Sequence, residues 1–71
     1  MSVVLPETFQ ERVRDFPETH GGVHTITVTL QDGSVISGVE VAWATEVIRV
    51  RGHATVPFTA DEIADVDDAS G

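Results

Sequence analysis

The sequence predicts a mainly β protein in which an N-terminal α-helix precedes a small, strongly bent, five-stranded antiparallel β-barrel. Short runs of alternating apolar and polar residues fill residues 24–66, and an Asp32-Gly33 pair joins two of them. Alternation is typical of strands with one buried face, and Asp-Gly is a strong hairpin signal. Gly38 lies inside the second run, where it predicts the bend that a strand needs to serve both sheets of a small barrel.

The length of the chain, 71 residues, allows one domain over residues 1–71. A domain of this size buries only about 60% of the surface of its unfolded chain and is marginally stable alone. The chain has no cysteine, so no disulfide supplements the core. We therefore expect a homo-oligomer or a complex with a protein partner.

The helix is predicted over about residues 6–16. Apolar side chains recur there at helical spacing, at Leu5, Phe9, Val13 and Phe16. Pro6 suits the first helical position and Pro17 ends the helix. This apolar stripe favours a helix that covers one mouth of the barrel over a helix that binds a partner.

The barrel is predicted over about residues 24–66, with strands at 25–30, 35–44, 46–51, 55–58 and 63–66. The inward side chains are expected to be Ile26, Val28, Leu30, Val35, Val39, Val41, Trp43, Ile48 and Val50. A short helical turn is predicted at residues 59–62, before the last strand. Residues 67–71 are expected to form a frayed acidic tail.

Charge limits the function classes. Twelve acidic residues face four basic ones, all arginines, and the formal net charge is −8. Because nucleic-acid binding depends on cations that neutralise phosphates, this charge argues against a nucleic-acid partner. No apolar run is long enough to span a membrane, and the N-terminus has no basic segment of a signal peptide, so we expect a cytoplasmic protein without membrane contact.

Two segments resemble the motifs of the Sm-like superfamily of small β-barrels. Residues 28–39 are similar to its first motif, and residues 58–66 match the spacing of its second. The resemblance implies rings that pair the fourth and fifth strands of adjacent subunits, and an RNA base pocket. The positions of that pocket hold Ala44, Val47 or Ile48, Thr59 and Ala60, which are not its usual residues. Asp61-Glu62-Ile63 is also similar to an Asp-x-Ile pattern of the small acidic Sm-like proteins that inhibit Rho.

Catalytic, cofactor and metal sites are not expected. The chain has no cysteine or tyrosine and no lysine, and no serine stands in a nucleophile elbow. His20, His24 and His53 do not have the spacing of a zinc site, and loop or surface positions are expected for them. We therefore predict a protein that is not an enzyme.

The predicted function is that of a non-catalytic interaction or assembly module, which binds protein partners or itself through exposed strand edges. The alternatives are an RNA-binding ring with a non-standard site built from Arg49, Arg51 and His53, and an acidic inhibitor of a nucleic-acid-binding protein. Trp43 is either a core or rim residue or an exposed anchor. The candidate interaction residues are Trp43, Arg49, Arg51, His53, Pro57, Asp61 and Glu62.

Overall fold

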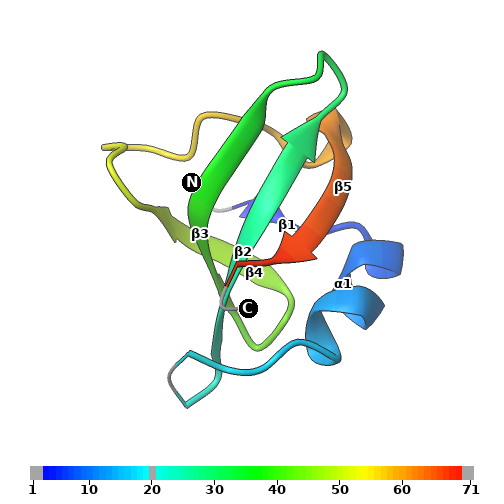
Figure 1. Ribbon diagram of the computed structural model, residues 1–71, viewed down its shortest axis with the longest axis vertical. Helices are drawn as coiled ribbons and strands as arrows, with labels where there is room; N and C mark the ends of the chain where they lie inside the picture. Colours follow the sequence, from blue (N-terminus) through cyan, green and yellow to red (C-terminus); the bar gives the residue numbers. More distant parts are fainter. Residues whose placement is uncertain (1–2, 20, 70–71) are drawn as a thin grey trace.

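The computed structural model describes residues 3–19 and 21–69 and shows a strongly curled, antiparallel five-stranded sheet with one helix against it (Figure 1). The predicted fold class is therefore confirmed. The elements are β1 (Val3–Val4), α1 (Glu7–Arg14), β2 (Val23–Leu30), β3 (Val35–Ala42), β4 (Glu46–Val50), the 3-10 helix η1 (Ala60–Glu62) and β5 (Ile63–Asp68).

The strand order in the sheet is β1-β4-β3-β2-β5, so β1 and β5 are its two edges. The β2–β3 hairpin turns at Asp32-Gly33 as predicted. Gly33 supplies a positive φ of 91°, and the Asp32 carboxylate accepts a 2.9 Å hydrogen bond from the backbone N–H of Ser34. The hydrogen bond lowers the pKa of Asp32.

The bend of β3 lies at Gly38, where the pairing with β2 shifts. Ile26 is opposite Val39, but Val28 is opposite Ile36, so β3 carries one extra residue at a bulge. Gly38 has a φ of 68°, and the backbone N–H of Arg51 donates a 3.0 Å hydrogen bond to its carbonyl oxygen. This bulge gives the sheet the local bend that the glycine predicted.

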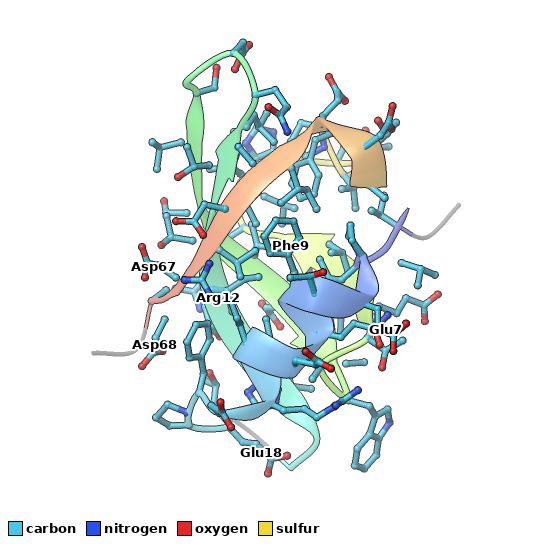
Figure 2. All side chains as sticks on the ribbon, turned by 90° about the vertical axis from the view of Figure 1, so that its right-hand side faces the viewer. Glu7, Phe9, Arg12, Glu18, Asp67 and Asp68 are labelled. Carbon is cyan, nitrogen blue, oxygen red and sulfur yellow. The ribbon has the colours of Figure 1, made fainter. Side chains whose placement is uncertain are left out.

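The core lies between the concave face of the sheet and α1. Alternate residues of β2 are buried, and Val13 of the helix is fully buried, with Phe9 packed against the core. The helical stripe is confirmed, although α1 is shorter than the prediction and Pro6 is its N-cap. Figure 2 shows α1 lying beside β5, with Arg12 directed toward that strand.

Of the two residues predicted to point inward from β4, Ile48 and Val50, the prediction for Ile48 is wrong because this strand contains a bulge. Val41 is opposite Val47, whereas Glu40 is opposite Arg49, so Ile48 is an extra residue that reverses the alternation. Val47 is buried instead, and the Ile48 side chain is 48% exposed. Val50 is buried as predicted.

The predicted strand at residues 55–58 does not form. The chain there has no ladder partner among the described residues, and the fifth strand is instead β1, which pairs Val3 with Val47 and Val4 with Glu46. Pro57, predicted within this strand, lies in the irregular segment. The predicted helical turn is confirmed as η1, which begins after a capping box formed by Thr59 and Glu62.

Three further predictions are corrected at the strand ends. The tail is ordered through residue 69, because β5 continues to Asp68 and Ala69 donates a 3.2 Å hydrogen bond to the Thr25 carbonyl oxygen. Residues 70–71 lie outside the described part. Val35 and Trp43 are not inward, because their side chains are 63% and 75% exposed. Trp43 lies beyond the end of β3, in the turn to β4, so the alternation of the strand does not determine the direction of its side chain.

Candidate functional site

The outer edge of β4 is only partly covered. β1 pairs with Val47 and Glu46, and beyond Val47 no described residue forms a ladder with β4 on this side. β1 itself has no strand on its other side in the described chain. An uncovered edge presents backbone N–H and C=O groups that can pair with another polypeptide.

Two adjoining hollows follow this edge, and together we call them the edge groove. One, of about 520 Å³, is lined by Val3, Val4, Thr55, Val56, Phe58, Thr59 and Ala60. The other, of about 320 Å³, is lined by Ile48, Arg49, Val50, His53, Ala54, Thr55 and Val56. They share Thr55 and Val56, so the irregular segment that replaces the predicted strand forms a common wall of both.

The first hollow is mostly apolar, and Val4 at its margin is 53% exposed. The second carries the polar groups, because Arg49 and His53 both line it. Ile48 also lines the second hollow, where the bulge turns its side chain away from the core. The groove therefore combines an uncovered strand edge with exposed apolar side chains.

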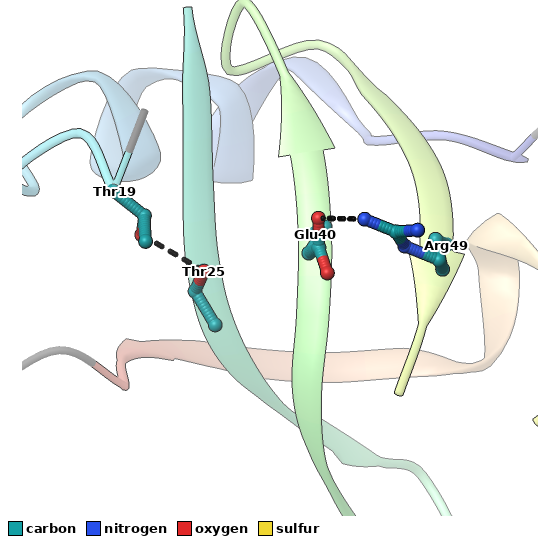
Figure 3. A network of polar contacts seen from close by, with 4 residues as sticks. All are labelled: Thr19, Thr25, Glu40 and Arg49. Carbon is teal, nitrogen blue, oxygen red and sulfur yellow. Dashed lines mark hydrogen bonds and ion pairs between the residues drawn. The ribbon is translucent and has the colours of Figure 1, made fainter. Parts of the chain in front are cut away.

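Arg49 is held by Glu40 on the neighbouring strand. One guanidinium nitrogen, Nη2, lies 3.0 Å from Oε1 of Glu40, whose side chain is only 10% exposed (Figure 3). The hydrogen bond and the charge of Glu40 raise the pKa of Arg49. A buried carboxylate needs a paired cation, so Arg49 compensates a charge of its own chain.

Arg51 is separated from Arg49 and His53, the other two residues of the predicted RNA site. Arg51 directly follows the last residue of β4, and its side chain lies over Gly38. The Cδ atom of Arg51 is 3.7 Å from the position that a Cβ on Gly38 would have. It lines a third hollow, which shares no residue with the edge groove. The structure thus brings together Arg49 and His53, but not Arg51.

Trp43 stands apart from the edge groove, in the β3–β4 turn. Its backbone N–H donates a 2.6 Å hydrogen bond to the Gly22 carbonyl oxygen. A Cβ on Gly22 would lie only 2.8 Å from the indole ring, so the ring rests on the backbone of this glycine. Trp43 and Ala44 both have positive φ values, 55° and 60°, which non-glycine residues seldom adopt.

Five of the twelve acidic residues lie along the opposite edge of the sheet, on η1 and β5. Arg12 of α1 forms an ion pair with Asp65 of β5. The hydrogen bond from Arg12 lowers the pKa of Asp65. Asp61 and Glu62 of η1 both accept hydrogen bonds from Thr59, and the hydroxyl of Thr59 lowers the pKa of Asp61.

Of the RNA-contact positions that the Sm-like resemblance implies, one is inside the core and a second has a buried candidate. Ala44 is 2% exposed, and Val47, one of the two candidates for the second position, is 1% exposed. Thr59 is exposed, but it is engaged in the capping box of η1. Ala44 and Val47 therefore cannot contact a base at the surface, whereas Thr59 and Ala60 line the first hollow of the edge groove.

His24 is a further residue that sequence reasoning placed wrongly. It lies in β2 with its side chain on the inner face, 5% exposed, and its Nδ1 atom has no hydrogen-bond partner among the described residues. The signal was present, because His24 continues the alternation of Ile26, Val28 and Leu30. His20 lies outside the described residues.

Within residues 3–19 and 21–69, no group of three or more histidine, aspartate or glutamate side chains is placed to hold a metal ion. No helix in this described part is long and apolar enough to cross a membrane. No protein-family model matches the chain, and neither curated proteins nor solved structures include a significant match to it.

Proposed function

We propose that the protein is a non-catalytic interaction module that binds an extended polypeptide segment, from a second copy or from another protein, along the edge groove. The single observation that carries the proposal is the uncovered edge of β4 beside the exposed side chains of Val4 and Ile48. An added strand would continue the line of β1 along β4. Backbone hydrogen bonds would supply affinity, and alternate side chains would enter the two hollows.

The resemblance to Sm-like barrels supports this location, because it implies assembly at a sheet edge. The size of the chain supports it as well, since a small core without disulfides gains stability from an added strand. The proposal places this activity in the cytoplasm, as the composition predicts. RNA is the weaker alternative, because Arg49 is paired with Glu40 and Arg51 lies outside the groove.

Self-association is tested by light scattering coupled to size exclusion at about 100 µM protein, at two salt concentrations. The wild type is expected to elute as an oligomer. Val4→Glu places a charge at the margin of the groove and should shift the protein toward monomer. Val35→Glu is the matched control, because Val35 is an equally exposed strand valine that does not line the groove.

A wild type that is strictly monomeric in both salts would refute self-association and leave a different protein as the occupant. That case is tested with a photo-crosslinking amino acid at position 4 or at position 35, expressed in the native host. Capture of a discrete partner from position 4 alone supports the proposal. Equal capture from both positions, or from neither, would overturn it.

A further inference from the structure

The third hollow has a composition that differs from the rest of the surface. It has a volume of about 420 Å³ and is lined by Thr25, Thr27, Ser37, Gly38, Arg51, Gly52 and Ala69. Three of these residues carry hydroxyl groups, one carries a guanidinium, and none has a large apolar side chain. The volume is at the lower end of the range for small-molecule sites.

The position of Arg51 in this hollow is fixed by Gly38. A Cβ on Gly38 would lie 2.8 Å from Cβ of Arg51 and 3.8 Å from its Cγ, so the stem of the arginine passes directly over the glycine. The backbone hydrogen bond from Arg51 to Gly38 holds the two residues side by side. Arg51 forms no ion pair with another described residue, in contrast to Arg12 and Arg49.

The hydroxyl groups come from two neighbouring strands. The bulge of β3 sets Ser37 and Gly38 beside Thr27 of β2. Thr27 and Ser37 make no side-chain hydrogen bond within the described residues, and Thr25 accepts one of 2.8 Å from Thr19 (Figure 3). All three hydroxyls therefore keep a proton to donate.

The surrounding charge limits the ligand. Asp67 is opposite Thr27 on β5, and Asp68 is next to it, so the hollow has acidic neighbours on one side. Glu40, opposite Thr25, is paired with Arg49. Among the described residues that line the hollow, Arg51 is the only cation, so the second charge of a dianion would be repelled by these carboxylates without a cation of its own to pair with. A carboxylate carries one charge and matches the fork of a guanidinium.

We propose that this hollow binds the carboxylate group of a small molecule or of a polypeptide, with Arg51 as the charged partner and the hydroxyls of Thr27 and Ser37 as further donors. The site is independent of the edge groove, because the two share no lining residue. Its failure would therefore leave the proposed function untouched.

The test is an amide NMR titration of ¹⁵N-labelled protein with sodium acetate, with sodium chloride at the same ionic strength as the reference. Saturable shifts are expected at the amides of Thr27, Ser37, Gly38 and Gly52, with a dissociation constant on the order of 10 mM for one ion pair in an open site. Arg51→Gln should weaken binding at least about tenfold. Arg14→Gln is the matched control, since Arg14 is an exposed arginine at the end of α1.

Phosphate at pH 7.5 should bind more weakly than acetate. Lactate and N-acetylalanine then distinguish the two sources of the carboxylate. Tighter binding of lactate indicates a small hydroxy acid, and tighter binding of N-acetylalanine indicates a polypeptide. Shifts that are linear, or unchanged in Arg51→Gln, would overturn the site, and stronger binding of phosphate would overturn the ligand class. If Arg51→Gln does not fold, Thr27→Val removes one donor without altering charge, and unchanged acetate affinity in that variant would overturn the proposal.

Discussion

Replacing Gly38 by alanine should destabilise the protein more than the same substitution at Gly21 or Gly52, where an added Cβ has no close neighbour. Two costs add at this position. The backbone has a φ of 68°, and a left-handed conformation costs an alanine about 1–2 kcal/mol. The new Cβ would also lie 2.8 Å from Cβ of Arg51, an atom that is fixed by its own backbone.

The second cost is an overpacking cost, which is typically about 1–3 kcal/mol. The sum is about 2–5 kcal/mol, against a total stability of roughly 4–10 kcal/mol for a chain of this length. Gly52→Ala separates the two terms, because Gly52 has a φ of 82° but nothing within 4 Å of its added Cβ. Gly21→Ala should have little effect, since Gly21 has neither a positive φ nor a close neighbour.

Urea unfolding followed by far-ultraviolet circular dichroism measures the series. Trp43 fluorescence is the poorer probe, because that side chain is already 75% exposed in the folded protein. The expected order of unfolding free energies is Gly21→Ala, then Gly52→Ala, then Gly38→Ala as the lowest. Equal values for Gly38→Ala and Gly52→Ala would show that the β3 bend relaxes around a methyl group, and would refute the close-approach argument.

Four other outcomes are expected. Fluorescence anisotropy with labelled oligo-uridine at about 100 mM salt should show no saturable sub-micromolar binding, because the net charge is −8; tight binding that Arg51→Ala abolishes would contradict this. Thermal midpoints should rise with salt, since ions screen the acidic residues within about 10 Å at 0.1 M; a flat or falling series would show that these charges are already compensated. The hydrogen bond from Arg12 lowers the pKa of Asp65 below 3.8, so this pair stabilises the fold above that pH and loses its contribution as the pH falls through the folded-state pKa. The stability difference between wild type and Arg12→Gln, measured by urea unfolding, should therefore vanish at low pH, and a constant difference would mean that Arg12 acts through packing. His24→Leu should raise the free energy of unfolding by about 1 kcal/mol, because it removes a buried polar atom without a described partner, and a loss of stability would argue against this.

Local patterns predicted the parts of the fold that local chemistry determines. The Asp32-Gly33 turn, the bend at Gly38 and the helical turn at residues 59–62 each depend on residues close in the sequence. The inner face of β2 follows from the strict alternation of residues 25–30.

The errors arose where one residue changes the alternation or where the partner is distant. The bulge at Ile48 reverses the face of β4, and nothing in the local pattern distinguishes Ile48 from Val47 as the inward residue. Val3 and Val4 give too short a run to predict a strand, and they become one only by pairing with β4 more than forty residues away. The candidate site depends on both features, so sequence alone could identify Arg49 and His53 but not the groove that contains them.

The same two features explain why an edge remains available on β4. If residues 55–58 had formed the predicted strand along the whole of β4, backbone hydrogen bonds would have covered that edge. Instead, β1 covers only Glu46 and Val47, and the bulge turns Ile48 outward just beyond that cover. An incoming strand would thus meet unpaired backbone and an exposed apolar side chain at the same point, which supplies both the hydrogen bonds and the apolar contact that strand addition requires.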